Sequence, residues 1–206
     1  MQRDVVWRAE SGSGSEYLRL HTRRGIQAAS TLTGSSDGQA FEASYAIGCD
    51  AFWRTRRVRV HLTSAQRADI ILRSDGNGHW KDGCRELLPA LDGCRDVDIS
   101  ATPFTNTLPI KRLALRPGES ADLVVVFVDI PTMTVQPVRQ RYTCLDRHAS
   151  GALYRFESMP YDALPDGFMA DLQVDADGLV LDYPGSFNRI DQPDSAMIMS
   201  QSQEHV

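Results

Sequence analysis

Two carboxylates, Asp96 and Asp98, have the spacing in this sequence that most directly suggests chemistry. They alternate with Val97 and Ile99 in a pattern typical of a strand, so both carboxylates should lie on one face of a sheet. Two positions along a strand separate the Cα atoms by ~6.5–7 Å. Neighbouring carboxylates need a proton, a cation or a sugar-like set of hydroxyl groups as partners. We therefore predict a polar site on a sheet.

Three interpretations of this carboxylate pair are open on the sequence alone. The pair can form ion pairs with basic side chains on neighbouring strands, and the candidates are Arg57, Arg59 and Arg112. It can line a polar binding pocket. It can also act on a glycosidic bond, because the two carboxyl groups could stand at the separations of roughly 5 to 9.5 Å that glycosidases use.

A glycine-rich loop over residues 75–83 precedes the pair. Asp75, Asn77 and Glu86 fall at calcium-loop positions 1, 3 and 12, but Trp80 replaces the turn glycine and no helices are predicted on either side. We therefore interpret the loop as a hairpin connection. Trp80 can also form the edge of a ligand site, where its ring would stack on a sugar ring or an acyl chain.

Other patterns that could carry chemistry have simpler structural explanations. Gly34-Ser-Ser-Asp-Gly38 matches the motif of a hydrolase nucleophile elbow, but that elbow joins a strand to a helix, whereas both flanks here are strand-like. We predict the tip of a hairpin instead. The four cysteines form no Cys-x-x-Cys pair and have no ligand spacing with histidine, so we predict small buried residues, no metal site and no cofactor.

Length and charge set further bounds. The 206 residues suffice for one sizeable domain, which we expect over residues 1–190, followed by a polar tail over 191–206. A formal net charge of −5 does not support nucleic-acid binding by a strongly basic surface. The first residues lack the apolar region of a signal peptide, and no apolar run approaches the ~20 residues that span a bilayer. We expect a cytoplasmic protein without a transmembrane segment.

Strand-like segments and turn signals alternate through most of the chain. Asp37-Gly38 and Asp175-Ala-Asp-Gly178 are typical of tight hairpins, because glycine accepts a positive φ. Residues 116–120 have the composition of a turn and separate strands predicted over residues 110–115 and 123–130.

Helix is predicted only over residues 85–91 and in a short turn over residues 103–107, which Thr102 would cap. The chain has neither an internal repeat nor an alternation of strands and helices. These patterns predict a mainly β protein, with a large and mostly antiparallel sheet that curls into a barrel, half-barrel or roll. A ligand would lie on the concave face.

Several phrases of the sequence together resemble a known family. They are Trp53-Arg-Thr-Arg after Tyr45, Asp75-Gly-x-Gly-x-Trp80 with Asp82-Gly83, Gln140-Arg-Tyr-Thr143, Asp177-Gly-Leu-Val-Leu-Asp-Tyr-Pro-Gly185 and the most specific segment, Asp96-Val-Asp-Ile-Ser-Ala-Thr-Pro-Phe-Thr-Asn-Thr-Leu-Pro-Ile110. In this order and spacing they resemble the glycolipid-binding family of bacterial proteins, long known as a domain of unknown function. The resemblance extends from about residue 6 to residue 189.

The resemblance implies a fold, an oligomeric state and a site. The fold is a large curved antiparallel sheet wrapped around one short helix, distantly similar to the periplasmic lipoprotein carriers. The oligomer is a homodimer, and an acidic pocket holds a glycolipid head group. We assign this pocket to Asp96 and Asp98, with Trp80 and Asp82 as neighbours.

We therefore expect a non-enzymatic protein that binds a glycolipid or a related sugar-bearing amphiphile and has a role in glycolipid metabolism. Asp96 and Asp98 would accept hydrogen bonds from sugar hydroxyls, which charge makes stronger than neutral ones. Trp80 or Tyr142 would stack on the ring, and Arg112 completes the predicted ligand-binding set. The alternatives are a carboxylate-dependent glycosidase or transferase acting on a glycolipid, and a structural or regulatory dimer without a ligand.

Overall fold

Strands make up most of the chain in the computed structural model, which describes residues 1–190 except 24, 37, 64–67 and 162–163. The polar tail predicted over residues 191–206 lies outside the described residues. The strands are β1 (Gln2–Ala9), β2 (Ser15–His21), β3 (Ile26–Ser36), β4 (Gln39–Cys49), β5 (Thr55–Leu62), β6 (Ala68–Ser74), β7 (Trp80–Lys81), β8 (Asp96–Ile99), β9 (Ser120–Val128), β10 (Val135–His148), β11 (Gly151–Ser158), β12 (Phe168–Asp175), β13 (Val180–Tyr183) and β14 (Phe187–Ile190). The helical segments are η1 (Pro89–Leu91), η2 (Phe104–Asn106) and α1 (Thr107–Leu113).

The fourteen strands of the described residues form one sheet in the order β7-β6-β5-β4-β3-β2-β1-β14-β13-β12-β11-β10-β9-β8. Neighbouring strands are antiparallel except for β8 and β9, which are parallel. This pair is parallel because the chain passes through η2 and α1 before it returns beside β8. The mostly antiparallel sheet that the sequence predicts is confirmed, with one parallel pair at its edge.

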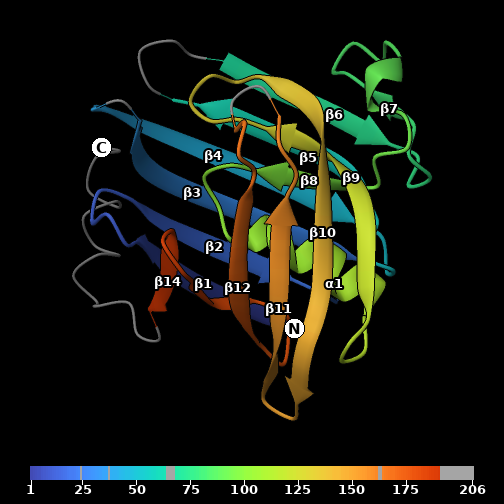
Figure 1. Ribbon diagram of the computed structural model, residues 1–206. Coiled ribbons are helices and arrows are strands. Elements are labelled where there is room, and N and C mark those ends of the chain that lie inside the picture. The colour runs from blue at the N-terminus through green and yellow to red at the C-terminus, as the bar shows by residue number, and fades with distance from the viewer. Residues whose placement is uncertain (24, 37, 64–67, 162–163, 191–206) are drawn as a thin grey trace.

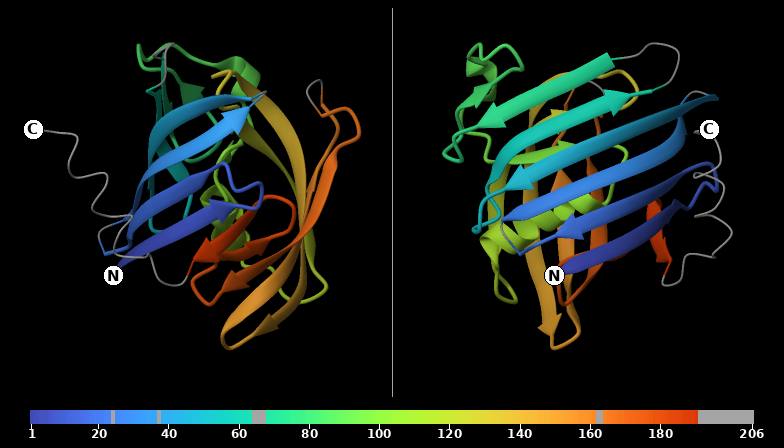
Figure 2. Two further views of the ribbon diagram at one scale, coloured as in Figure 1. Left: turned by 90° about the vertical axis from the view of Figure 1, so that its left-hand side faces the viewer. Right: turned by 180° about the vertical axis from the view of Figure 1, so that it is seen from behind.

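The sheet curves until its two halves face each other. Figure 1 shows β10–β12 in front of β1–β4, and the left view of Figure 2 shows α1 between the two halves. Near the two ends of the strand order, β5 and β8 come into contact. Buried and exposed side chains alternate along β3, as expected when one face of a strand lines the interior. The predicted half-barrel around one short helix is confirmed.

Helix α1 occupies part of the stretch from residue 110 to 115, where the sequence predicts a strand, so that prediction is wrong. Thr102 Oγ1 accepts a hydrogen bond of 3.0 Å from the Phe104 N–H just before η2, but the N-cap residue is Pro103, so the cap predicted at Thr102 is one residue too early. Pro109 lacks an N–H and suits the first helical turn better than a strand interior. The helix ends at Ala114, whose backbone is left-handed at φ 48° and ψ 41°.

The predicted hairpin over residues 34–38 is confirmed. Ser36 at the end of β3 pairs with Gln39 at the start of β4, and Gly38 has a φ of +76°, while Asp37 lies outside the described residues. Because strands flank the turn on both sides, the Gly-x-Ser-x-Gly pattern here is not a nucleophile elbow.

The hairpin predicted over residues 175–178 is also confirmed, since it joins β12 to β13. The helix predicted over residues 85–91 is wrong for most of that stretch, because only η1 at its end is helical. Arg85 has a φ of +70°, which is incompatible with a right-handed helix at that position.

Helix α1 contacts the two larger of the three hydrophobic cores that the described residues form. Leu108 packs in the core formed by the inner face of β1–β6 together with β8, whereas Ile110 packs in the core of β10–β13. The helix is only seven residues long, and an isolated helix of that length is unstable in water. Its stability therefore comes from burial between the two halves of the sheet.

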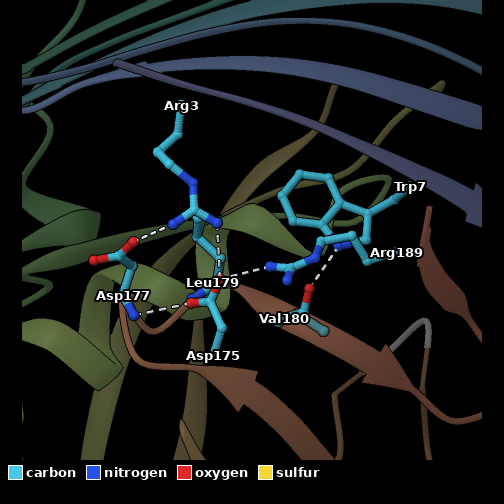
Figure 3. Close-up of polar contacts among 7 residues, drawn as sticks. All are labelled: Arg3, Trp7, Asp175, Asp177, Leu179, Val180 and Arg189. Atoms are coloured by element: carbon cyan, nitrogen blue, oxygen red, sulfur yellow. Dashed lines mark hydrogen bonds and ion pairs between the residues drawn. The ribbon is translucent and has the colours of Figure 1, made fainter. Parts of the chain in front are cut away.

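The β12–β13 hairpin is fixed to β1 and β14 by a carboxylate, as Figure 3 shows. Asp175 accepts hydrogen bonds from Arg189 Nη1 at 2.6 Å and Arg3 Nη2 at 3.2 Å, and Arg3 also pairs with Asp177. The Asp175 side chain also accepts the backbone N–H groups of Asp177 and Leu179 at 2.9 and 3.0 Å, which shapes the turn. One carboxylate thus shapes the hairpin and attaches it to the centre of the sheet.

The substitution Asp175→Asn should destabilise the protein by about 1–3 kcal/mol, since it removes the charge from hydrogen bonds to two guanidinium groups. The Asp175 side chain is only 13% exposed, so solvent screens these bonds little. Urea denaturation gives the free energy of unfolding.

Asp122→Asn is the matched control, because Asp122 pairs with Arg141 where the two side chains are 68% and 45% exposed. It should cost much less stability than Asp175→Asn, because solvent screens an exposed ion pair. Equal losses in the two variants would contradict the proposed importance of the Asp175 contacts.

Candidate functional site

Both carboxylates of β8 face the helical segment, as the strand alternation predicts. Asp96 is fully buried, and Arg112 in the last turn of α1 donates from Nε to both carboxylate oxygens, at 2.9 and 3.1 Å. Arg112 Nη2 adds a third bond of 2.5 Å. Burial raises the pKa of Asp96, and the guanidinium group of Arg112 opposes that shift. Of the three arginines considered as partners from the sequence, Arg112 is the one that pairs with Asp96.

Asp98 has a different environment, because it is half-buried and forms no ion pair with any described residue. It accepts hydrogen bonds from the Thr105 hydroxyl at 2.7 Å and from Gln140 Nε2 at 2.6 Å. Burial raises the pKa of Asp98, and these two hydrogen bonds oppose the shift. Gln140 is itself buried, and its Oε1 has no hydrogen-bond partner among the described residues. Asp98 and Gln140 therefore offer unsatisfied hydrogen-bonding capacity.

Several tyrosines lie close enough to Asp98 for its charge to raise their pKa values. Tyr183 lies 6.0 Å from Phe168 and 6.3 Å from Phe156, measured between ring centroids. Burial and then the charge of Asp98 raise the pKa of Tyr183, so its hydroxyl lies within the electrostatic field of that carboxylate. Burial, then the charge of Asp129 and then that of Asp98 raise the pKa of Tyr161.

The strand register brings Phe168 to the same part of the sheet as Gln140. Gln140 of β10 pairs with Ser158 of β11, and Ser158 pairs with Phe168 of β12. Phe168 remains 36% exposed. A half-buried carboxylate, an amide and accessible aromatic rings are the groups that bind a sugar, through hydrogen bonds to hydroxyls and contact with the ring face.

The other predicted site residues have different surroundings. Tyr142 is 1% exposed, and its hydroxyl donates to Asn106 Oδ1 at 2.8 Å. Trp80 is fully buried and donates from Nε1 to the carbonyl oxygen of Cys94 at 2.7 Å. Asp82 follows β7 and accepts the Glu86 N–H at 2.9 Å. The structure thus brings Asp96, Asp98, Arg112 and Tyr142 to η2 and α1, but places Trp80 and Asp82 at β7.

A second buried carboxylate, Glu16 of β2, was not among the predicted site residues. It is 1% exposed and accepts hydrogen bonds from Tyr45 at 2.5 Å and Ser30 at 2.8 Å. The Tyr45 hydroxyl also lies 3.3 Å from Thr102 Oγ1, which links β2 and β4 to the start of η2. Glu16 Oε2 has no partner among the described residues. Burial raises the pKa of Glu16 to about 7, against hydrogen bonds from all three hydroxyl groups.

The sequence contains a signal for Glu16. It alternates with Tyr17 and Arg19 and shares the inward face of β2 with Leu18 and Leu20, both of which are buried. A carboxylate in an otherwise apolar row of a strand is a marker of a buried polar group.

Possible metal ligands and thiols do not add a second site. Among the described residues, no group of three or more His, Cys, Asp or Glu side chains could hold a metal ion. Cys49, Cys94 and Cys144 are buried as predicted, whereas Cys84 is exposed because it lies in the turn after β7. The same residues include no helix long and apolar enough to cross a bilayer.

Comparison with known proteins identifies the family of the chain. Residues 4–189 match the family described as "Putative glycolipid-binding". The chain belongs to this family. The segment over residues 96–110 that carries the resemblance to the glycolipid-binding family forms β8, η2 and the first half of α1, so it supplies both carboxylates, Thr105 and Asn106.

A solved structure agrees with the assignment to the glycolipid-binding family. The crystal structure of a DUF1089 family protein from Pseudomonas aeruginosa is 39% identical in sequence and superimposes with a TM-score of 0.76. The alignment covers 86% of this chain and 92% of that chain. Among curated proteins, none matches the chain.

The buried carboxylate of Glu16 should make stability fall as pH rises. Its pKa is about 7 in the folded protein against 4.5 for an unburied glutamate, so the folded state holds the proton more tightly. Between these values the folded state binds more protons than the unfolded state, and the free energy of unfolding decreases with pH. The total loss is about 3 kcal/mol.

Denaturation of the wild type and Glu16→Gln at pH 5 and pH 8 measures this loss, because other titrating groups cancel in the difference. The variant should lack the Glu16 contribution and lose less stability between the two pH values. The same pH dependence in both proteins would show that Glu16 does not hold a proton in the folded state.

Proposed function

We propose that this protein binds a glycolipid or a related sugar-bearing amphiphile without transforming it, and that the sugar contacts Asp98. The observation that carries the proposal is the state of this carboxylate, which is half-buried, lacks a cationic partner among the described residues and lies beside a buried amide. Sugar hydroxyls can donate to Asp98, which is the partly exposed member of the pair, while Gln140 holds the carboxylate from the buried side. The family assignment gives independent support for this class of ligand.

Asp96 has a supporting role in this proposal. Both of its oxygens are bound to Arg112, and its side chain is fully buried, so it has no capacity left for a ligand. The ion pair instead holds α1 against β8. Thr105 lies between these two elements, so the ion pair fixes the position from which its hydroxyl donates to Asp98.

Aromatic contact with the ligand is assigned to Phe168 and Tyr183, because Tyr142 and Trp80 are buried. The acyl chain has to lie near these rings at the edge of the interior, since α1 and its packing partners fill the concave face. Tyr161, which packs on Phe127 at 5.5 Å between ring centroids, extends the same aromatic surface.

The structure gives no specific support to the glycosidase alternative. A pair of carboxylates that acts on a glycosidic bond must reach the substrate from both members. Asp96 cannot do so while Arg112 occupies both of its oxygens. The homodimer and the cytoplasmic location stay predictions, and light scattering of the purified protein tests the first.

The test is binding of dodecyl maltoside, a sugar-bearing amphiphile, with dodecylphosphocholine as an amphiphile that has no sugar. Both probes are used below their micelle concentrations, and native mass spectrometry with titration calorimetry measures the complexes. The wild type should prefer dodecyl maltoside, and Asp98→Asn should weaken that binding about tenfold, the size of one charge-assisted hydrogen bond.

Asp122→Asn is the control, because it removes a carboxylate from an exposed ion pair on β9 and should leave affinity unchanged. The Asp98→Asn variant should fold normally, because asparagine has nearly the same shape and its amide oxygen can still accept the hydrogen bond from Thr105. Equal affinity of the folded variant and the wild type would remove Asp98 from the site. A wild type that binds both probes equally or binds neither would contradict recognition of the sugar.

A further inference from the structure

Three basic side chains lie side by side on the outer face of the sheet, far in the strand order from Asp98. The register pairs Arg57 of β5 directly with Arg73 of β6, and Arg73 directly with Lys81 of β7. The right view of Figure 2 shows β5 and β6 along one border of this face. Adjacent strands are about 4.8 Å apart, so the long side chains of this basic row can meet at one ligand.

Charge repulsion within the basic row is not relieved inside the protein. None of the three side chains forms a hydrogen bond or ion pair with any residue that the structure describes, whereas nearby basic residues are partnered. Arg56 pairs with Asp50 at 3.7 Å, and Arg59 pairs with Asp69 at the same distance. Like charges at directly opposed positions of a sheet destabilise it. The row is therefore suited to an anion from outside the described chain.

Arg73 provides the second observation. Its Nε is hidden from solvent and has no acceptor among the described residues. A buried donor without an acceptor costs free energy, and native proteins rarely leave one unsatisfied. A ligand that brings an oxygen to this position would satisfy the donor and neutralise the guanidinium group.

There is room for such a ligand beside the row. A hollow of about 440 Å³ is lined by Arg56, Arg57 and Arg73 and extends over Gly48 of β4 to Gln27 of β3, and Lys81 lies next to Arg73 beyond its border. A side chain at position 48 would meet Gln27 at 3.2 Å, so the glycine keeps this hollow open. The hollow thus joins cationic groups to an uncharged amide.

We propose that Arg57, Arg73 and Lys81 bind a phosphoryl anion, such as a diphosphate or the phosphate of a lipid head group. Arginine presents a planar fork of donors that matches phosphate oxygens, and lysine adds a point charge. Three cations suit a multiply charged anion better than a single carboxylate. This site lies on the outer face of β5–β7, apart from the proposed sugar site, and does not depend on it.

The first test is titration calorimetry of the full chain with inorganic pyrophosphate at low salt. The wild type should bind, with an affinity that decreases as salt screens the charges. Arg73→Gln, which keeps much of the side-chain length but removes the charge and the buried Nε, should weaken binding at least about tenfold. Arg8→Gln is the control, since Arg8 is exposed on β1 and its loss changes the net charge equally.

A stability measurement separates binding from folding. Without pyrophosphate, Arg73→Gln should melt at least as high as the wild type at low salt, because the substitution relieves repulsion within the basic row. With pyrophosphate, the wild type and Arg8→Gln should gain melting temperature and Arg73→Gln should not. An absence of binding by the wild type, or equal responses from both variants, would overturn the proposal.

A second arm identifies the source of the phosphoryl group. Vesicles of phosphatidylcholine with phosphatidic acid are compared with vesicles of phosphatidylcholine alone by co-sedimentation. Binding of the wild type but not of Arg73→Gln to the acidic vesicles supports the site with a lipid as its ligand. Binding of pyrophosphate alone supports the site with a soluble phosphate, and binding of neither overturns it.

Discussion

The ion pair between Asp96 and Arg112 is the interaction on which the arrangement of the interior depends. It joins the edge strand β8 to the only α-helix of the described residues, and it is shielded from water because the Asp96 side chain is fully buried. A fully buried carboxylate that keeps its charge needs a cation and hydrogen bonds to compensate it, and otherwise it holds a proton. The ion pair thereby fixes the rotation and depth of the helix, and the two larger hydrophobic cores pack against it.

The ion pair that positions α1 also determines where the polar groups of the interior lie. With α1 in place, η2 carries Thr105 to Asp98 and places Thr102 beside Tyr45. Asp98 of β8 is thus bound directly to the segment over residues 102–106, and Glu16 of β2 is linked to it through Tyr45. A curved sheet has few other ways to join its facing halves through hydrogen bonds, because its own backbone groups are used within the strands.

The sequence predicts the sheet well because the alternation of buried and exposed side chains along a strand depends on neighbouring residues alone. Each strand that pairs with it has the same alternation. The same dependence on local sequence explains the predictions that were wrong. Ile110, Leu113 and Leu115 fit a strand or a helix equally, and only the packing of α1 between two cores decides between them. For the site, residue types indicate Asp96, Asp98 and Arg112, but not which carboxylate the arginine binds. Trp80 has the composition of a ligand contact, and its burial depends on how residues 91–94 cover it.

The position of β1 in the sheet has a consequence for the order of events during synthesis. This first strand lies between β2 and β14, so its second edge finds a partner only when residues 187–190 have left the ribosome. Until then, the nascent chain displays an unpaired strand edge, which is prone to join other chains. Pairing β1 with β14 also gives the fold many contacts between residues distant in sequence, which slows folding. Chaperones that cover exposed strand edges would therefore act on this chain until β14 is made.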